Sequence, residues 1–329
     1  MAPDCTAANA KTSPVTPDDI REAYARIRPH VRRTPVMDLA GSELDHDTAV
    51  SLKLELFQHA GSFKPRGAFN NLLSREVPAS GVAAASGGNH GAAVAYAAHQ
   101  LGHPADIFVP EISSPAKIAK IRAAGARLHV GGARYADALA ACEDHQQASG
   151  AIGIHAYDAM ETVAGQGTLG LEWEEQVPEL DSVLIAVGGG GLISGVAAWF
   201  SGRAKVIAVE PQGSRALHAA LEADAPVDVS VESLAADSLG ARSIGGLNFE
   251  ICRKHVTQSL LVEDGAIETA MAWLWHRLQI ATEPGGATAL AALLSGAYRP
   301  QPGERVGVLV CGGNVAPETL AELPNPSLA

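Results

Sequence analysis

Four consecutive glycines, Gly188 to Gly191, follow the apolar run Ser182–Val187 and precede a stretch of helical character that begins at Leu192. Glycine lets the backbone curl so that successive N–H groups point inward, and the start of a helix adds partial positive charge. This combination predicts a phosphate-binding loop, although the same residues could form only a flexible tight turn.

Dinucleotide-binding folds also place a glycine-rich loop after a strand, and an acidic residue follows it by about 20 residues. Glu210 stands at about that distance from the four glycines. The G-x-G-x-x-G spacing of such folds fits poorly, because its last glycine would fall on Ile193 or Ser194. A nicotinamide dinucleotide is therefore the less favoured ligand.

A second glycine-containing loop, Ser86-Gly87-Gly88-Asn89-His90-Gly91, precedes another predicted helix. It offers a hydroxyl group, a side-chain amide and backbone N–H groups at a helix start, which suit a carboxylate or another anion. A plain helix N-cap formed by Ser86 or Asn89 would have a similar sequence. From these residues alone, both interpretations stay open.

Lys64 lies in the segment Gly61-Ser62-Phe63-Lys64-Pro65-Arg66-Gly67-Ala68. Most lysines are solvated surface charges, but the neighbours of this one are small, apolar or rigid, which predicts a fixed and partly buried amine. Burial lowers the pKa of an amine and makes it a better nucleophile at neutral pH. Lys64 is therefore the candidate catalytic residue.

The loop Cys311-Gly312-Gly313-Asn314 follows a further apolar run, Arg305–Val310. Its glycines permit the close approach of a ligand, whereas Cys311 taken alone is more typical of a small core residue. Ligands in open α/β sheets bind beyond the carboxyl ends of the strands. Loops that follow predicted strands are expected to lie at that edge.

The elements that position these loops are short apolar runs that alternate with helical stretches from about residue 82. This alternation predicts βαβ units and parallel sheets. The predicted strands are Asp106–Val109, Leu128–Val130, Ile152–His155, Val183–Val187, Val206–Val209 and Val306–Val310. The predicted helices are Gly91–Gln100, Pro115–Ala124, Arg134–Gln147, Val163–Glu175, Leu192–Phe200, Ile267–Gln279 and Ala287–Ser295. Another helix is expected to start near Pro17 with Thr16 as its N-cap, and Ala223–Val231 is expected to be a surface loop.

The chain has 329 residues and a formal net charge of −12. So acidic a surface repels nucleic acid and anionic membranes, and no apolar run is long enough to span a bilayer. The four cysteines, at positions 5, 142, 252 and 311, are scattered and favour neither a disulfide framework nor a zinc site. A cytoplasmic location is therefore expected. Residues 1–17 lack the apolar core of a secretory signal and are expected to form a disordered tail.

The order of four motifs, S-F-K-x-R-G-A, S-x-G-N-H-G, G-G-G-G-L and G-G-N, resembles that of the fold type II enzymes that depend on pyridoxal 5′-phosphate. Within them it is most similar to the serine/threonine dehydratases and serine racemases. The resemblance runs from about Ile20 to Val315 and includes Ser243–Asn248 and Glu283–Ala287. It implies an α/β fold like that of the tryptophan synthase β subunit, with two open twisted sheets flanked by helices.

The resemblance also implies a division into domains and an assembly. Residues 82–160 would form a small domain, inserted into a large cofactor-binding domain made of residues 18–81 and 161–329. The family expectation is a homodimer that acts on a small amino-acid substrate. The cofactor would contact Phe63, Lys64, Asn89, Gly188, Gly189, Gly190, Gly191, Leu192, Glu283, Cys311 and Gly312.

Roles for individual residues follow from the same resemblance. Lys64 would hold the cofactor as a Schiff base and then remove the α-proton of the substrate, while Phe63 would stack on the cofactor ring. Asn89 would hydrogen-bond the ring hydroxyl, and Cys311 would face the pyridine nitrogen. The substrate carboxylate would bind Ser86, Gly87, Gly88, Asn89 and His90. With a β-hydroxyl as the leaving group, the products would be a 2-oxo acid and ammonia.

Departures from the family pattern refine this expectation. Serine racemases carry a serine just before G-N-H that acts as a second base, and here that position is Gly87, which favours dehydration over racemisation. Cys311 resembles the cysteine of some serine dehydratases. A neutral thiol would not hold the ring nitrogen protonated, and this also favours elimination.

Two further departures concern metal binding and regulation. Related enzymes bind Mg²⁺ or Ca²⁺ through a glutamate and an acid six residues later, but here Glu210 is followed by Ala216, so no such site is expected. A variant site formed by Glu210, Ser214 and Asp237 stays open. Because the chain stops soon after Asn314, no C-terminal regulatory domain with isoleucine control is expected.

Other functions stay open beside the dehydratase. One is an isomerase of serine- or aspartate-like substrates, which a hydroxyl group supplied near Gly87 from elsewhere would favour. Another is a lyase for an unusual β-substituted amino acid such as 3-hydroxyaspartate, which a basic side chain from Arg134, Arg215 or Arg242 would favour. A cofactor-free binding protein is the least favoured interpretation.

Overall fold

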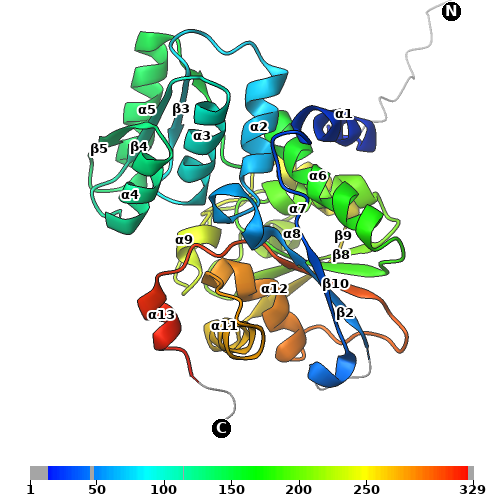
Figure 1. Cartoon of the computed structure of the whole chain (residues 1–329). Helices are drawn as coiled ribbons and strands as arrows, with labels where there is room; N and C mark the ends of the chain where they lie inside the picture. The colour runs from blue at the N-terminus through cyan, green and yellow to red at the C-terminus, as the bar shows by residue number, and fades with distance from the viewer. Residues whose placement is uncertain (1–13, 45–47, 114, 325–329) are drawn as a thin grey trace, which may run out of the picture.

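The computed structural model describes residues 14–44, 48–113 and 115–324 of the chain, with the side chains of residues 115–117 left aside. Two β-sheets organise these residues, and helices flank both of them (Figure 1). The smaller sheet and its helices form the upper left part of that view, and the larger sheet lies below and to the right. The expected α/β fold with two flanked sheets is confirmed.

The larger sheet has the strand order β1-β2-β10-β7-β8-β9. Strand β1 pairs with β2 in antiparallel fashion, and all the other neighbours are parallel. Its strands are β1 (Val36–Leu39), β2 (Val50–Leu54), β7 (Ser182–Ala186), β8 (Lys205–Pro211), β9 (Val256–Val262) and β10 (Val306–Val310). The central strands β7 and β10 are buried along their whole length, as parallel strands covered on both faces must be.

The smaller sheet has the order β5-β4-β3-β6 and is parallel throughout. Its strands are β3 (Val82–Ala85), β4 (Ala105–Val109), β5 (Arg127–Val130) and β6 (Ile152–Gly153). A helix connects each strand to the next in the chain: α3 (Asn89–Gln100), α4 (Pro115–Ala123) and α5 (Tyr135–Ser149).

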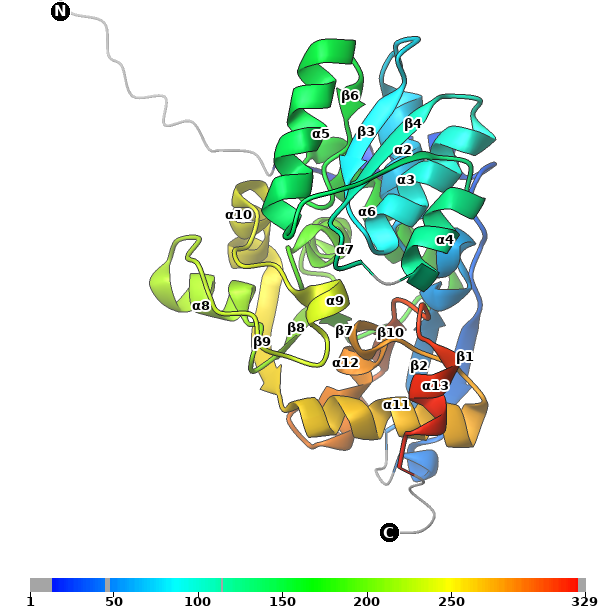
Figure 2. The same cartoon turned by 90° about the vertical axis from the view of Figure 1, so that its left-hand side faces the viewer.

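We call the smaller sheet with α3, α4 and α5 the smaller body, and the larger sheet with its flanking helices the larger body. The remaining helices cover the larger sheet or join the two bodies. They are α1 (Pro17–Ile27), α2 (Pro65–Ser74), α6 (Met160–Gln176), α7 (Gly191–Phe200), α8 (Ala216–Ala223), α9 (Ala236–Leu239), α10 (Gly246–His255), α11 (Asp264–Leu278), α12 (Pro284–Leu294) and α13 (Pro317–Ala321). Short 3₁₀ turns are η1 (Gly41–Glu43), η2 (Glu55–Phe57) and η3 (His59–Gly61). In Figure 2, α9 lies between the smaller body above and α12 below, and α13 lies beneath α4.

Helix α2 connects the two apolar cores of the molecule. Ala68, Phe69 and Leu72 pack into the core of the smaller sheet with the alanines of α3. The first turn of α2 lies instead against the larger body, as the contacts of Arg66 below show. Helix α2 therefore fixes its own N-terminus relative to both sheets.

The predicted strands and helices are confirmed in place, with ends that shift by a few residues. The predicted strand at Ile152 ends earlier, at Gly153, and Thr16 caps α1 as expected by accepting from the N–H of Asp19. Val15, near the end of the predicted 1–17 tail, is buried, and residues 1–13 lie outside the described residues. Beyond α8, the expected loop is confirmed up to Val231.

Strands β1, β2 and β9 were not predicted, and β3 was expected only as the start of the alternation near residue 82. Strand β2 contains Lys53, which interrupts its apolar pattern, and β9 lies at the edge of the sheet with all but its last residue exposed or half-buried. No helix within the described ranges has the length and apolar character needed to cross a membrane.

Candidate active site

Lys64 lies directly before α2, in a turn that is attached to the loop after β10. Ser62 forms an isolated β-bridge with Gly312, and the N–H of Phe63 donates to the carbonyl of Cys311 at 3.1 Å. Pro65 occupies the first helical position, where a missing N–H costs no helical hydrogen bond. Two of the four predicted loops therefore meet at Lys64.

The amino group of Lys64 donates a hydrogen bond to the carbonyl of Ala156 at 2.9 Å and lies 5.1 Å from the centre of the Phe63 ring. Burial lowers the pKa of this amine to about 8, and the nearby Cys311 and Glu283 oppose the shift. A substantial fraction of the amine is therefore neutral in weakly alkaline solution, and the neutral form acts as a nucleophile or a base.

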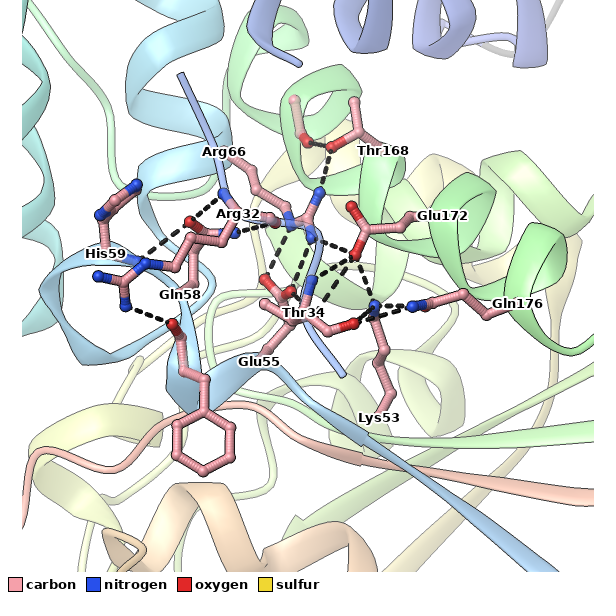
Figure 3. A network of polar contacts seen from close by, with 12 residues as sticks. Arg32, Thr34, Lys53, Glu55, Gln58, His59, Arg66, Thr168, Glu172 and Gln176 are labelled. Carbon is pink, nitrogen blue, oxygen red and sulfur yellow. Dashed lines mark hydrogen bonds and ion pairs between the residues drawn. The ribbon is translucent and has the colours of Figure 1, made fainter. Parts of the chain in front are cut away.

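Two residues after Lys64, Arg66 belongs to a buried group of four charged side chains with Lys53, Glu55 and Glu172 (Figure 3). Arg66 binds Glu55 through two hydrogen bonds of 2.7 and 2.8 Å, and a Glu172 oxygen lies 3.0 Å from the same guanidinium group. Lys53 donates to Glu172 at 2.6 Å. Two cations balance two carboxylates, as buried charges require.

Polar neighbours tie this group to the rest of the larger body. The hydroxyl of Thr34 donates to Glu55 at 2.6 Å, and the amine of Lys53 donates to Gln176 at 2.7 Å. Burial alone would raise the pKa of Glu55, but Arg66, Lys53 and Thr34 together outweigh it and hold that pKa below its usual value. The group joins the segment before β1, strand β2, turn η2 and helices α2 and α6, and so it fixes the turn that carries Lys64.

The four-glycine loop follows β7 and leads into α7, as predicted. Gly190 has a φ of +94°, a conformation that only glycine adopts readily. A Cβ atom at Gly189 would lie 2.4 Å from the Tyr157 ring, and one at Gly190 would lie 2.4 Å from Ile244. Among the described residues no side chain caps α7, so its N-terminal N–H groups fit an anion such as a phosphate.

The segment between β6 and α6 contacts both Lys64 and the glycine loop, although it carries no recognisable motif. Its Ala156 carbonyl accepts from Lys64, and its Tyr157 carbonyl accepts from Asn248 at 3.0 Å. Asp158 accepts from the first two N–H groups of α10, each at 3.1 Å. The only signal for this segment was its place after a predicted strand of the smaller sheet.

The loop before α3 presents Ser86, Gly87, Gly88 and Asn89, all half-buried. Gly88 itself occupies the N-cap position, and no described side chain caps this helix. The interpretation of Ser86 or Asn89 as a plain N-cap is therefore wrong. The Ser86 hydroxyl instead accepts from the N–H of Gly88 at 3.2 Å, and the uncapped helix start fits a carboxylate.

The ring of His90 is directed to the smaller body. Its Nε2 atom lies 2.8 Å from the carbonyl of Ile154, and burial lowers its pKa to about 3. The imidazole is therefore neutral, and the carbonyl requires Nε2 to be the donor. The ring keeps no second N–H for a carboxylate, so only the backbone N–H of His90 fits the expected role in substrate binding.

Cys311 and Glu283 lie beside Lys64 at the carboxyl end of β10. The Cys311 thiol donates to the carbonyl of Gly285 at 3.4 Å, and burial raises its pKa far above the usual range, so the thiol is neutral. The Glu283 carboxylate accepts from the side-chain amide of Asn89 at 2.6 Å. A Cβ atom at Gly312 would overlap the carboxylate of Glu283 at 1.9 Å, so a larger residue there would displace that carboxylate.

A cleft of about 680 Å³ opens beside these residues, between the two bodies. It is bounded by the loop before α3, by α4, by the segment before α9, by the start of α12 and by the chain after β10. The described residues that line it are Gly87, Gly88, Asn89, Ala92, Lys120, Leu234, Asp237, Ser238, Glu283, Pro284, Gly313, Asn314, Val315, Ala316, Pro317, Glu318 and Thr319. Of the predicted site residues, Gly87, Gly88, Asn89 and Glu283 therefore border an open space.

These features fit pyridoxal phosphate. The fit requires an amine that can be neutral, an uncapped helix start for the phosphate and a neutral thiol beside the amine. Lys64, the loop before α7 and Cys311 meet these three requirements.

Two of the three residues of the variant cation site, Glu210 and Ser214, are engaged elsewhere. The two carboxyl oxygens of Glu210 accept from the N–H groups of Leu217 and His218, both at 2.8 Å, and burial raises the pKa of Glu210 to about 8. The hydroxyl of Ser214 donates to the carbonyl of Leu239 at 2.9 Å. Within the described ranges, no group of three acidic, histidine or cysteine side chains could hold a metal ion.

Comparison with known proteins agrees with this geometry. A family model described as "Pyridoxal-phosphate dependent enzyme" matches residues 27–312. A phenylserine dehydratase of Ralstonia pickettii is 41% identical over 90% of this chain and 92% of its own length. An L-threonine ammonia-lyase of Geobacter sulfurreducens is 36% identical over 92% of this chain and 76% of its own. The structure of maize serine racemase superposes with a TM-score of 0.88 at 36% identity, and covers 94% of this chain and 96% of that one.

Proposed function

The chain belongs to the pyridoxal-phosphate-dependent enzymes, and from that premise we propose that it is an ammonia-lyase for a β-hydroxy amino acid. It would eliminate water from the substrate, and a water molecule would then hydrolyse the resulting enamine, so that ammonia leaves and a 2-oxo acid remains. One observation carries the proposal: the buried amine of Lys64, with a pKa of about 8, lies beside the neutral thiol of Cys311. The relatives named as dehydratase and ammonia-lyase support the same reaction.

The proposed cofactor site uses the predicted residues. Lys64 would attach the cofactor, Phe63 would lie against its ring, and Asn89 would face the ring hydroxyl. The phosphate would be held by Gly188, Gly189, Gly190, Gly191 and Leu192, and the ring would be bordered by Glu283, Cys311 and Gly312. When bound, pyridoxal phosphate withdraws electrons from the α-carbon of an attached amino acid, so that its α-proton becomes acidic and a β-hydroxyl can leave.

Lys64 moves the proton in the proposed reaction. Its Nζ atom takes the α-proton in the neutral form, which a pKa of about 8 makes accessible. The protonated amine can then return that proton to the leaving hydroxyl, which departs as water. Because Cys311 stays a neutral thiol, it would not keep the ring nitrogen of the cofactor protonated. A protonated ring nitrogen would favour return of the proton to the α-carbon, so its absence favours elimination.

The proposed substrate site is the loop before α3. The uncapped N–H groups at this helix start, with Ser86, Gly87, Gly88, Asn89 and the backbone of His90, bind the α-carboxylate. The cleft beside the loop is far larger than the side chain of serine. We therefore include 3-phenylserine with L-serine and L-threonine among the candidate substrates, in line with the named relative.

The test is the formation of a 2-oxo acid from L-serine, L-threonine and 3-phenylserine by the cofactor-loaded protein. Formation that disappears in Lys64→Ala and persists in Lys254→Ala, a change at an exposed lysine of α10, would support the proposal and rank the substrates. No 2-oxo acid from any β-hydroxy amino acid, 3-hydroxyaspartate included, would refute it.

A second candidate function is an amino-acid isomerase, and Ser113 favours it. A Cβ atom at Gly87 would lie 2.4 Å from the hydroxyl oxygen of Ser113, so a hydroxyl from another loop lies beside the position where serine racemases carry a serine. Chiral analysis of serine after incubation tests this candidate. D-serine formed by the wild-type protein but not by Ser113→Ala would support it.

We further propose that the protein is a cytoplasmic homodimer with a small domain at residues 82–160 and a large domain at residues 18–81 and 161–329. The relatives are named after reactions of amino acids, which supports a small-molecule amino-acid substrate. Light scattering after size-exclusion chromatography tests the assembly, because a mass of one chain, 33.9 kDa, would refute the dimer.

A further inference from the structure

Four side chains that line the cleft form one continuous series of hydrogen bonds: Lys120, Asn314, Asn89 and Glu283. The amine of Lys120 donates to Oδ1 of Asn314, whose Nδ2 donates to Oδ1 of Asn89 at 2.5 Å. Nδ2 of Asn89 donates in turn to Oε1 of Glu283 at 2.6 Å. Helices α4 and α3 of the smaller sheet contribute the first and third residues, and the chain around β10 and α12 contributes the others, so the series crosses the cleft repeatedly.

The two ends of the series fix the direction of every hydrogen bond in it. An ammonium group can only donate, and an ionised carboxylate can only accept. The amides of Asn314 and Asn89 between them can therefore take only one orientation. Asn314 is held further by a second donation, from its Nδ2 to the carbonyl of Ala60 at 2.9 Å. Because all three bonds run the same way, their dipoles add and strengthen one another.

The consequence concerns which atom of Asn89 faces a ligand. Its Nδ2 atom has two hydrogens, and the bond to Glu283 uses one of them. In the reverse orientation, the oxygen of Asn89 would face the Glu283 carboxylate, and its nitrogen would face the nitrogen of Asn314. Two acceptors would then face each other at the contact with Glu283, and two donors at the contact with Asn314.

We infer that Lys120 and Asn314 are positioning residues, which fix the amide of Asn89 so that an N–H group faces the cofactor. The inference rests on the proposed function, which assigns the ring hydroxyl of the cofactor to Asn89. Neither residue contacts Lys64 through a hydrogen bond of the described residues, so their effect reaches the cofactor through Asn89.

Asn314→Asp is the variant that separates positioning from structural support. A carboxylate at this position keeps the shape of the side chain and can still bind Lys120, but it cannot donate to Asn89 or to Ala60. The dissociation constant of pyridoxal phosphate, measured by titrating the cofactor-free protein and following visible absorbance, is expected to rise about tenfold. The melting temperature of the cofactor-free protein is expected to stay close to that of the wild type.

Lys120→Met removes the first donor of the series and leaves the amides in place. Its exposed side chain makes the expected rise in the dissociation constant smaller, about two- to threefold. Lys254→Met is the matched control, because it removes an exposed lysine of α10 that lines no part of the cleft.

An unchanged dissociation constant in Asn314→Asp would overturn the inference. Weakened binding that is matched by an equal loss of thermal stability would also overturn it, because that pattern indicates structural support alone. A wild-type protein that binds the cofactor but forms no 2-oxo acid would refute the proposed reaction, and the binding titration would still decide the role of the series. A wild-type protein that binds no cofactor would refute both.

Discussion

Arg66 and Glu55 form a two-point ion pair, with distances of 2.7 and 2.8 Å, in which neither side chain is exposed to solvent. Arg66 follows Lys64 by two residues, while Glu55 lies in the turn after β2. The pair therefore attaches the first turn of α2 to the larger sheet. Replacing only one member of this pair would leave the other charge buried without its partner. An unpaired buried charge destabilises the fold far more than the intact pair does.

The variant Arg66→Met is expected to lower the free energy of unfolding by about 3–5 kcal/mol, because it leaves Glu55 buried without its partner. Urea denaturation of the cofactor-free protein measures this change. The control is Arg33→Met, which breaks a half-exposed contact of 3.9 Å with Glu175 and should cost less than about 1 kcal/mol. The double variant Glu55→Gln/Arg66→Met should recover part of the loss, and a loss that is simply additive would contradict this explanation.

Lys64 is expected to destabilise the cofactor-free protein at neutral pH. Its pKa is 10.5 in the unfolded reference and about 8 in the folded chain, so between these values the unfolded state binds more protons and stability rises with pH. Lys64→Met removes this cost and should be more stable than the wild type at pH 7 by about 3 kcal/mol. The difference should shrink as the pH rises through 8 toward 10.5. Urea denaturation of both proteins at several pH values is the measurement, and a difference that does not vary with pH would count against the lowered pKa.

Two glycine substitutions separate backbone strain from the fit of the phosphate loop. Gly190 and Gly202 both have positive φ, +94° and +85°, but a Cβ atom would meet Ile244 at the first and nothing within 4 Å at the second. Both alanine variants should lose about 1–2 kcal/mol of stability from the left-handed backbone. Only Gly190→Ala should also weaken cofactor binding, by at least about tenfold. Equal cofactor affinities in the two variants would argue against a phosphate at this loop.

Added Mg²⁺ or Ca²⁺ at millimolar concentration is expected to leave the melting temperature unchanged. Backbone N–H groups occupy both oxygens of Glu210, and its pKa of about 8 keeps the group largely protonated at pH 7, so it offers a cation little charge. A rise in melting temperature that disappears in Glu210→Gln would reveal a cation site there.

The sequence predicted the parts of the fold and site that depend on local chemistry. Gly190 could be recognised because its backbone conformation requires glycine, and β7 and β10 because strands buried on both faces must be apolar. Strand β2 was not predicted because it contains a lysine. Lys53 can be buried in the core because it pairs with Glu172, which lies 119 residues away in the chain. Pairing of this kind has no local signature.

The same limit applies to the site. Tyr157 and Lys120 carry no motif, and their importance lies in contacts with Gly189 and Asn314, which are distant in sequence. Asn314 was visible as part of a glycine-containing loop, but a sequence cannot show the direction of its hydrogen bonds. Long-range side-chain contacts were therefore the part that could not be predicted.

The position of β10 has a consequence for synthesis of the chain. Among the strands of the described residues, β10 is synthesised last, yet it inserts between β2 and β7. On the ribosome, the facing edges of those two strands remain unpaired until Val310 has emerged, and an unpaired strand edge is prone to join another chain. The loop that carries Cys311 follows immediately, so the emergence of one short strand both closes the larger sheet and completes the surroundings of Lys64.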